Sequence, residues 1–465
     1  MNKTKCPRLL LAGGGSGSGK TLITCGIMAA LKERGYHLGS LKCGPDFIDP
    51  MFHRTVIGSE SGNLDSFFMD PDLMRVHLAS MGQRTDFIMM EGVMGYYDGV
   101  SNSLHGSSWE IGQLTNTPVI LLFNGRGMGL SMVAQLKGLV EYQKSNTIQG
   151  IILNQVSEKT YQTMRERIET ECKVPVLGYV PKMNHIFLES RHLGLKMPNE
   201  IEHIKEELTQ FGKELEKTIQ FERLIQIGME AEDLWWNAAT VKTLNHPLSI
   251  AVARDEAFCF LYQENIEFLK DIGATVQFFS PLHDEQLPSG TQVILLPGGY
   301  PELYAKELEQ NKKMRNEIAS MIRNGTPVIA ECGGYLYLGS ELMDPVGESF
   351  QMVGVLPFSG KKQDRLGKFG YVEVTAEWPV NHSLLSNKAR AHEFHYYETY
   401  EGENLKAGEF FKIQKADGSN EWKAGYQIGR GFGGFPHFYY NSNRELFYEI
   451  FDSMTQQRGD NSNDQ

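Results

Sequence analysis

A glycine-rich loop near the start of the chain has the residue types that hold a nucleoside triphosphate. Residues 13–21 read GGGSGSGKT, directly after the apolar run LLLA and before a helical stretch. Glycines let backbone N–H groups point at phosphate oxygens, and the N-terminus of the following helix adds a favourable dipole. Lys20 would reach the β and γ phosphates, and the Thr21 hydroxyl would bind Mg²⁺. The predicted ATP-binding residues are Gly14, Gly17, Gly19, Lys20 and Thr21.

Carboxylates follow two further apolar stretches and could face this loop. Asp46 and Asp49 lie in KCGPDFIDP, and Glu91 and Asp98 lie in DFIMMEGVMGYYDG. Ligands of open α/β sheets bind at the carboxyl ends of strands, so the four side chains can converge there. We expect Thr21, Asp46 and Glu91 to hold Mg²⁺. We expect Asp49 and Asp98 to support phosphoryl transfer, although Asp49 precedes a proline and could be a turn residue.

A second chemistry is indicated by a cysteine at the end of an apolar strand. Cys332 lies in PVIAECGGYLYLG, and a strand, a tight turn and a helix would present it as a nucleophile. A lone cysteine is usually a small buried hydrophobe, but its position before Gly-Gly favours catalysis. His437 in GGFPHFYY is the predicted base that activates the thiol. The N–H groups of Gly299 and Gly333 are predicted to form an oxyanion hole.

The elements that must position these residues alternate between apolar strands and helices. Continuous apolar runs are typical of parallel strands covered by helices on both faces, so we predict two doubly wound α/β domains. The predicted domains are residues 1–198 and 246–453, joined by a helical connector at 199–245 and followed by a disordered polar tail at 454–465. The strands predicted in the first domain are residues 8–12, 39–42, 86–90, 118–123, 149–154 and 175–179.

Size and composition narrow the class of protein. The 465 residues are 41% hydrophobic and 22% charged, which is the balance of a globular protein with more than one domain. No apolar run has the roughly 20 residues that span a bilayer, and we read no signal peptide. The six cysteines form no CxxC pair, which favours reduced thiols in the cytoplasm. A net charge of -12 argues against a broad nucleic-acid surface.

Several motifs together resemble a known enzyme family along about the whole chain. PGGYPE, ECGGYLYLG and PHFYY resemble the glutamine amidotransferase domain shared by the cobyrinic and cobyric acid synthases. GPDFIDP, NLDSFFM, EGVMGYYDG, RHLGL and EFHYYE sharpen the resemblance to the cobyrinate a,c-diamide synthase family. No single motif decides the family, but their order and combination are specific.

The resemblance implies a fold and a set of roles. The first domain would be similar to dethiobiotin synthetase, and the second to class I glutamine amidotransferases. Cys332 would attack glutamine, and His437 would be the base that activates the Cys332 thiol. Class I enzymes carry a Glu two residues after this histidine, where the chain has Tyr439, so the site resembles a dyad more than a triad. His392 and His395 in AHEFHYYE have metal-site spacing, but a structural loop is favoured because no ligand set is completed.

The two chemistries complement each other. A carboxylate does not react with ammonia until phosphorylation supplies a leaving group. ATP in the first domain would make an acyl phosphate, and glutamine hydrolysis in the second would supply neutral ammonia. The implied partners are L-glutamine and a corrinoid bearing several carboxylates, amidated at its a and c side chains. Homodimerisation, the order of the two amidations and the need for cobalt are open from the sequence.

Two alternatives stay open. Within the family, hydrogenobyrinic acid or nickel-sirohydrochlorin could be the tetrapyrrole, because the same motifs serve them. From another class, the chain could be a regulatory ATPase whose amidotransferase-like domain only binds a partner. The presence of both Cys332 and His437 argues against the second alternative.

Overall fold

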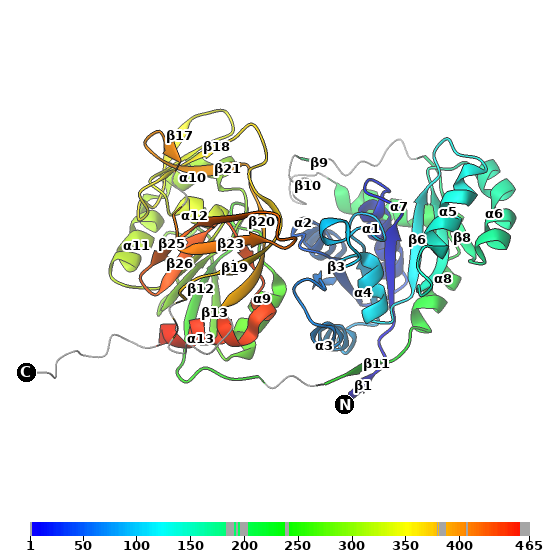
Figure 1. The fold of residues 1–465 in the computed structure, drawn as a ribbon, viewed down its shortest axis with the longest axis horizontal. Coiled ribbons are helices and arrows are strands. Elements are labelled where there is room, and N and C mark those ends of the chain that lie inside the picture. The colour runs from blue at the N-terminus through cyan, green and yellow to red at the C-terminus, as the bar shows by residue number, and fades with distance from the viewer. Residues whose placement is uncertain are drawn as a thin grey trace, which may run out of the picture. The chain divides into compact units, whose positions relative to one another are not determined.

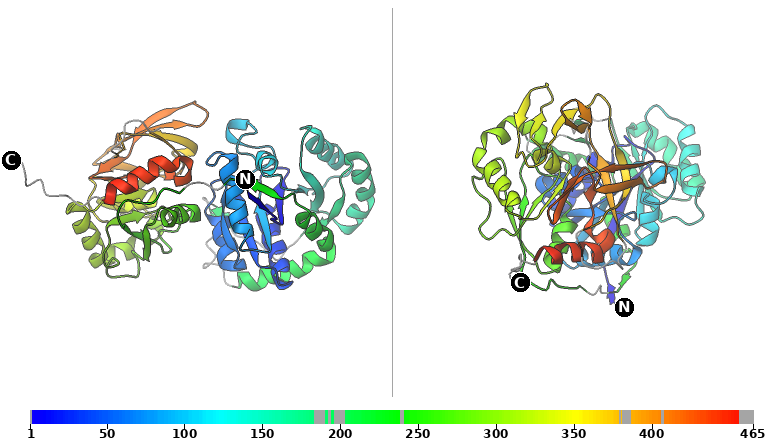
Figure 2. Two further views of the ribbon diagram at one scale, coloured as in Figure 1. Left: turned by 90° about the horizontal axis from the view of Figure 1, so that it is seen from below. Right: turned by 60° about the vertical axis from the view of Figure 1, so that its left-hand side comes forward.

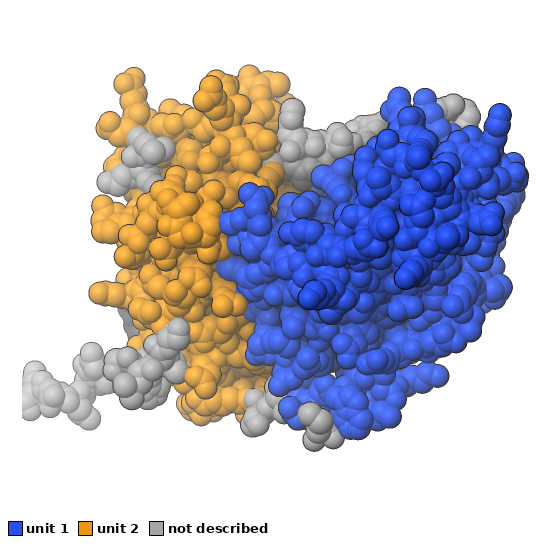
Figure 3. Space-filling model, turned by 45° about the vertical axis from the view of Figure 1, so that its right-hand side comes forward, with its two compact units in different colours: residues 1–239 blue, residues 240–465 orange. Residues whose placement is uncertain are grey.

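The computed structural model divides into two compact units, Met1–Ala239 and Thr240–Gln465 (Figure 1, Figure 3). The residues that the structure describes are 2–182, 190–191, 194–195, 203–237, 241–378, 380, 387–405 and 408–455. The RHLGL motif lies partly outside these residues, and the predicted tail lies outside them from residue 456 onward.

The first unit is built on a parallel sheet with the strand order β4-β3-β5-β2-β6-β7-β8. The connection β2–α1–β3 and the connections from β5 through α4 to α6 run in opposite directions along the sheet, so crossovers of the usual right hand put α1 and α4 to α6 on opposite faces. Figure 2 shows this unit in two further views. The strands are β2 (Arg8–Gly13), β3 (Leu38–Cys43), β4 (Glu60–Leu64), β5 (Phe87–Glu91), β6 (Val119–Asn124), β7 (Ile148–Asn154) and β8 (Val176–Val180). The helices are α1 (Lys20–Glu33), α2 (Ile48–Phe52) with the π-helix η1 (His53–Ile57), α3 (Pro71–Gly82), η2 (Val100–Asn102), α4 (Ser108–Leu114), α5 (Ser131–Glu141), α6 (Glu158–Cys172), α7 (Ile204–Thr218) and α8 (Phe221–Met229).

The predicted strands of this sheet are confirmed, and one further strand is present. Residues 8–12, 39–42, 86–90, 118–123, 149–154 and 175–179 overlap β2, β3, β5, β6, β7 and β8. The additional strand is β4, whose sequence ESGNL is polar and lies at the sheet edge. This strand is nonetheless buried, and its Ser61 and Asn63 side chains are hydrogen-bonded inside the protein, so it lacks the continuous apolar run by which the others were found.

Helices α7 and α8, from the segment expected as a connector, belong to the first compact unit. A methyl group on Gly26 of α1 would come within 2.6 Å of Phe211, and one on Gly212 of α7 would come within 2.9 Å of the Gly26 carbonyl oxygen. Glycine at both positions therefore allows the two helices to pack closely. After α8, strand β11 (Leu234–Trp236) pairs antiparallel with the N-terminal strand β1 (Asn2–Thr4). A short pair, β9 (Ser190–Arg191) and β10 (Gly194–Leu195), completes the strands described in this unit.

The second unit contains another largely parallel sheet, in the order β13-β12-β14-β15-β26-β25, with only β25 antiparallel. Its strands are β12 (Ser249–Ala253), β13 (Thr275–Phe279), β14 (Val293–Leu296), β15 (Val328–Glu331), β25 (Tyr426–Ile428) and β26 (Gly431–Gly434). The helices around it are α9 (Gln263–Asp271), η4 (Pro301–Tyr304), α10 (Ala305–Gln310), α11 (Lys312–Arg323), α12 (Gly333–Tyr337), η5 (Tyr440–Asn443) and α13 (Arg444–Thr455).

Two smaller sheets extend the second unit, and the sequence reading did not anticipate them. An antiparallel sheet has the order β24-β23-β19-β20-β27, and a mixed sheet has the order β17-β16-β18-β21-β22. The chain passes from β26 of the parallel sheet into β27 of the antiparallel sheet, so the two sheets meet at this junction. Their strands are β16 (Glu341–Met343), β17 (Ser349–Gln351), β18 (Ser359–Lys362), β19 (Phe369–Thr375), β20 (Lys388–Phe394), β21 (Tyr397–Glu401), β22 (Asn404–Leu405), β23 (Phe411–Lys415), β24 (Glu421–Ala424) and β27 (His437–Phe438).

Two other expectations can be compared with the structure. Cys6, Cys25, Cys43, Cys172, Cys259 and Cys332 are all free thiols. In the part of the chain that the structure describes, no helix combines the length and apolar character needed to cross a membrane.

Candidate functional sites

The glycine-rich loop joins β2 to α1 at the centre of the first sheet. Gly17 and Gly19 have φ angles of 71° and 90°, a conformation that side chains disfavour. A methyl group on Gly19 would also lie 2.7 Å from the amide nitrogen of Asn154. Asn154, at the end of β7, donates a hydrogen bond of 2.8 Å to the carbonyl oxygen of Ser18. A neighbouring strand thus holds the loop in shape.

Two predicted phosphate ligands make bonds within the protein itself. The N–H of Gly14 donates to the Leu122 carbonyl oxygen at 3.1 Å, so in this arrangement it serves the sheet and not a phosphate. The Lys20 ammonium donates to the carbonyl oxygens of Gly15 at 3.2 Å and Met94 at 2.5 Å. Burial and the nearby Lys42 ammonium lower the pKa of Lys20 to about 8. Phosphate oxygens placed at this end of the loop would supply the negative charge that favours its protonated form.

Carboxylates meet Thr21 at the carboxyl edge of the sheet, as the strand registers require. Glu91 pairs with Leu11 of β2 on one side and with Lys42 of β3 on the other. The Thr21 hydroxyl donates to Glu91 Oε1 at 2.6 Å and lies 3.3 Å from Asp49 Oδ2. The structure therefore brings Thr21, Asp49 and Glu91 together.

Asp46 and Asp98 have different surroundings. Asp46 Oδ1 accepts the backbone N–H groups of Ile48 at 2.7 Å and Asp49 at 3.1 Å, so this oxygen shapes the start of α2. Asp98 Oδ2 accepts the N–H of Gly95 at 2.9 Å, and its charge acts on Lys20. Asp49, which the sequence reading assigned to phosphoryl transfer, has the contact to Thr21 that was expected of Asp46.

A buried lysine and a buried histidine of this cluster were missed by the sequence reading. Lys42 forms ion pairs with Asp49 and, at 2.8 Å, with Glu91. Burial would lower the pKa of Lys42, but these carboxylates outweigh it and hold the pKa well above its ordinary value. His53 Nε2 lies 3.1 Å from Glu91 Oε2. A lysine in an otherwise apolar strand, in SLKCG, was the signal that could have identified Lys42.

The pKa values of Asp49 and Glu91 are shifted in opposite directions. Burial and the charges of Asp46 and Glu91 raise the pKa of Asp49 well above its usual value. Burial would also raise the pKa of Glu91, but Lys42 and His53 hold it below the usual range.

The donor set around Thr21 fits a magnesium ion. No group of three His, Cys, Asp or Glu residues suited to a metal is found among the described residues. Mg²⁺ needs fewer protein ligands when phosphates supply the rest, and a hydroxyl and two carboxylates are its preferred donors.

In the second unit, Cys332 occupies a strained turn between β15 and α12. Its φ angle is 47° and its ψ angle is -105°, which is unfavourable for a residue with a side chain. Its N–H donates to the Gly434 carbonyl oxygen at 2.7 Å, which ties the turn to β26. The strand, sharp turn and helix predicted for a nucleophile are present, and Cys332 is 7% exposed.

Gly299 and Gly333, the predicted oxyanion residues, lie side by side. A methyl group on Gly333 would come within 3.0 Å of the Gly299 nitrogen. A methyl group on Gly299 would meet the Ala257 carbonyl oxygen at 2.1 Å, so no side chain fits there. The Gly333 N–H also interacts with the Cys332 sulfur and favours its ionised form. Two backbone donors thus converge beside the thiol.

His437 reaches the same turn from β27. A methyl group on Gly298 would lie 2.3 Å from Cε1 of the His437 ring. Because Gly298 precedes Gly299, His437 and the Cys332–Gly333 turn both border this short segment. Burial, with a contribution from His392 and His395, lowers the pKa of His437 to about 3.

The thiol environment favours the neutral form. Burial raises the pKa of Cys332 above its usual value, and the carboxylates of Glu302, Glu393 and Glu331 add to this. Together with the low pKa of His437, this means that both groups are neutral when nothing is bound.

The residue two positions after His437 is not an acid in contact with it. Tyr439 is fully buried and packs edge-on against Tyr262 at a ring distance of 5.3 Å. Glu331 Oε1 instead accepts the N–H of Phe438 at 3.3 Å and so fixes the strand that carries His437. Burial raises the pKa of Glu331 to about 8, so this carboxyl is mostly protonated at neutral pH. Sequence reading missed Glu331, although an acid ending a buried strand was visible beside Cys332.

The AHEFHYYE segment is a strand for most of its length, not the loop that was expected. His392 belongs to β20 and pairs with His437 across the two strands. His395 follows the strand end and stacks on Phe435 with ring centroids 3.8 Å apart. Alternation of polar and apolar residues in KARAH, residues 388–392, was the sequence signal of a strand with one face in the core.

Comparisons with known proteins identify a family for each of the two domains. Residues 9–195 match the CobQ/CobB/MinD/ParA nucleotide binding domain family, and residues 249–445 match the CobB/CobQ-like glutamine amidotransferase domain family. The chain is 37% identical over 458 residues to a cobyrinate a,c-diamide synthase of Listeria monocytogenes serotype 4b, covering 96% of this chain and 99% of the relative.

Other relatives are similarly close. The chain is 36% identical over 444 residues to a protein of the same name from Priestia megaterium, covering 94% of this chain and 95% of the relative. It is 35% identical over 441 residues to one from Salmonella typhimurium, covering 94% and 96%. The chain belongs to the cobyrinate a,c-diamide synthase family of glutamine-hydrolysing, ATP-dependent ligases.

Proposed function

We propose that this protein amidates the a and c side-chain carboxylates of cobyrinic acid with ammonia taken from glutamine. The observation that carries the proposal is the Gly298–Gly299 segment, which borders both His437 and the Cys332–Gly333 turn. Such a turn suits a thiol that attacks an amide carbonyl while two N–H groups stabilise the oxyanion. The names of the relatives support cobyrinate as the substrate.

In the amidotransferase site, Cys332 gives its proton to His437 and its sulfur bonds to the side-chain carbonyl carbon of glutamine. The N–H groups of Gly299 and Gly333 stabilise the tetrahedral oxyanion, and the proton returns from His437 to the departing ammonia. Water then attacks the thioester, releasing glutamate and regenerating the thiol.

In the synthetase site, the glycine-rich loop and Lys20 hold ATP while a substrate carboxylate oxygen attacks the γ phosphorus. ADP leaves and a carboxyl phosphate forms. Ammonia then attacks the carbonyl carbon, phosphate leaves, and the amide nitrogen loses a proton. Thr21, Asp49 and Glu91, with Asp46 and Asp98 nearby, would hold Mg²⁺, which supplies charge neutralisation on the phosphates. Lys42 keeps the two buried carboxylates in place beside Thr21.

The test combines substrate identity with two variants. Glutamine labelled with a heavy isotope at its amide nitrogen is incubated with ATP, Mg²⁺ and cobyrinic, hydrogenobyrinic or nickel-sirohydrochlorin acids, and products are analysed by mass spectrometry. Two labelled nitrogens in cobyrinic acid alone are expected. Labelling of another tetrapyrrole instead would replace the substrate assignment.

The variants separate the two sites. Cys332→Ala is expected to abolish glutaminase and glutamine-dependent amidation but to retain amidation with ammonium salts. Lys20→Ala is expected to abolish amidation from either nitrogen source. Glutaminase activity that survives in Cys332→Ala would remove this residue from the reaction and would favour a binding role for the second unit.

A further inference from the structure

A buried carboxylate that the reaction above does not use follows the strand pair that carries His437. Glu393 belongs to β20, and its side chain is 1% exposed. In the register of β20 with β27, His392 faces His437, so Glu393 is the next residue beyond the proposed base. Its charge reaches the thiol, because Glu393 is among the carboxylates that raise the pKa of Cys332.

The first carboxyl oxygen of Glu393 is in contact with His395. Nε2 of the His395 ring lies 3.2 Å from Glu393 Oε1. Nδ1 of the same ring lies 2.6 Å from the Tyr397 carbonyl oxygen, and these two contacts hold the ring in place.

The second carboxyl oxygen of Glu393 has no such partner. Oε2 is buried, and no donor to it is present among the residues that the structure describes. Buried acceptors are nearly always paired in native proteins, because an unpaired one loses its hydrogen bond to water. A buried orphan oxygen next to the His392–His437 pair thus points to a ligand that brings its own donor.

We propose that Glu393 Oε2 binds the α-ammonium group of the glutamine whose amide Cys332 attacks. This proposal rests on the assignment of glutamine hydrolysis to Cys332. In glutamine the α-nitrogen lies four bonds from the reacting carbonyl carbon, a reach of roughly 5 Å, so it stays close to the thiol. Glu302 is a further carboxylate whose charge acts on that thiol. A cationic substrate group is the natural counterpart of such surroundings.

Binding of the ammonium would also prepare the nucleophile. The carboxylates that oppose ionisation of Cys332 would be compensated by the substrate's own positive charge. The thiol proton could then pass to His437 only when an amino acid of the right charge is seated. Glu393 thus couples recognition of glutamine to activation of the thiol.

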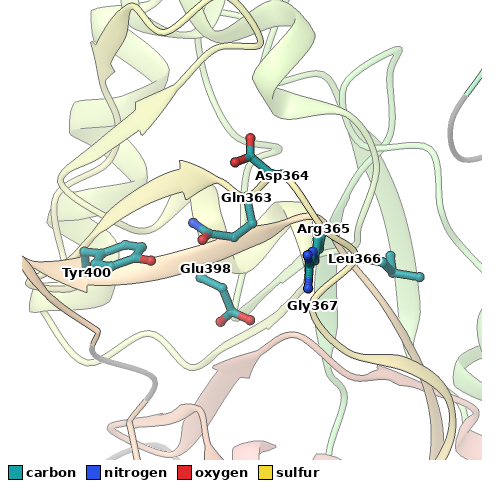
Figure 4. Close-up of a pocket in the computed structure, with 7 residues that line it drawn as sticks. All are labelled: Gln363, Asp364, Arg365, Leu366, Gly367, Glu398 and Tyr400. Carbon is teal, nitrogen blue, oxygen red and sulfur yellow. The ribbon is translucent and has the colours of Figure 1, made fainter.

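A neighbouring cavity is the rival location for the amino-acid head group. It has a volume of 440 Å³ and is lined by Gln363, Asp364, Arg365, Leu366, Gly367, Glu398 and Tyr400 (Figure 4). A methyl group on Gly367 would lie 3.5 Å from Cε1 of His395, so the cavity adjoins the partner of Glu393. Asp364 and Glu398 are the acidic side chains that line this cavity, and Glu398 is the one that also lies beside Gly367 and could take an ammonium group instead. Replacing each glutamate in turn distinguishes the two locations.

The experiment compares glutamine with glutaramate, which carries the same amide but no α-ammonium group. Release of ammonia is measured to obtain kcat/KM for both compounds with the full-length chain. Glu393→Gln is expected to lower kcat/KM for glutamine about 10- to 100-fold, the loss typical of one charge-assisted hydrogen bond, and to leave that for glutaramate nearly unchanged. Glu398→Gln and the exposed Glu348→Gln serve as matched controls and are expected to keep the wild-type ratio.

The outcomes separate this inference from the function it rests on. A purely structural role for Glu393 would lower kcat/KM for both compounds equally, and that result would overturn the proposal. Collapse of the ratio in Glu398→Gln would overturn it too, in favour of the cavity. Glutaminase activity in Cys332→Ala, measured in parallel, would instead refute the assignment of the nucleophile. An unchanged kcat/KM for glutaramate in Glu393→Gln would show that the second unit of the variant is folded.

Discussion

The carboxyl group of Glu331 makes the second unit sensitive to pH in a way that one substitution should remove. Burial raises the pKa of Glu331 from 4.5 to about 8 in the folded chain. Between these values the folded carboxyl keeps its proton while the unfolded one loses it. The unfolded state then binds fewer protons, so the free energy of unfolding falls as the pH rises. This contribution is fully present below the unfolded pKa and is lost progressively up to the folded one.

The size of the effect follows from the shift. Each pH unit within this window corresponds to about 1.4 kcal/mol, so raising the pH from about 6 to about 8 should cost the wild type roughly 2–3 kcal/mol through this group. Glu331→Gln cannot ionise, and its amide oxygen can still accept the Phe438 N–H that Glu331 Oε1 accepts. The variant is therefore expected to gain that amount relative to the wild type over the same interval.

The assay is urea unfolding at the two pH values, followed by tryptophan fluorescence. Replacing Trp109, Trp235 and Trp236 of the first unit by Phe leaves Trp378 and Trp422 to report on the second unit. Trp378 is suited to this because it is buried against Phe432, with ring centroids 5.3 Å apart. Glu348→Gln, at an exposed position of the same unit, controls for the loss of a charge. Parallel pH profiles for the wild type and Glu331→Gln would refute the reasoning.

Three further substitutions test other contacts. Gly298→Ala would place a methyl group 2.3 Å from the His437 ring, so glutaminase should fall about 100-fold while ammonium-dependent amidation persists; a small effect would mean that the ring has room to move. Asn154→Ala removes the bond to Ser18, so KM for ATP should rise about 5-fold in the ammonium-dependent assay, with glutaminase unchanged. Lys42→Met removes the ion-pair partner of the buried Asp49 and Glu91 carboxylates. Thermal unfolding should therefore show the first unit destabilised by about 3–5 kcal/mol, with a smaller destabilisation at acidic pH.

Parallel strands and tight turns were readable from the sequence because their physical requirements are local. A strand covered on both faces must be apolar throughout, and this pattern made β2, β5 and β6 recognisable in the sequence. Loops that bring backbone close to a ligand or a thiol need glycine. Glycine therefore made two loops recognisable in the sequence: residues 14–19 and the Gly-Gly pair after Cys332. These features depend on few distant residues, so composition and order suffice to find them.

Contacts set by register and by sheet junctions were not readable in this way. Asp49 and not Asp46 meets Thr21 because the turn before α2 uses Asp46 as its own hydrogen-bond acceptor. The partnership of β20 with β27 joins segments more than 40 residues apart, so nothing local marks it. Lys42 and Glu331 are charged residues in buried strands, and that conflict was the available sign of a special role.

The way in which residues 203–236 fold back on the first unit sets the limits of any fragment that could be produced alone. Arg8 is fully buried and donates a 2.9 Å hydrogen bond to the Glu232 carbonyl oxygen, and Leu208, Phe211 and Leu215 of α7 are buried in this unit. A recombinant nucleotide-binding fragment that ended at residue 198 would uncover these apolar contacts and deprive a buried guanidinium of an acceptor. A fragment that continues through Trp236 keeps the β1–β11 pair and should remain folded and in solution.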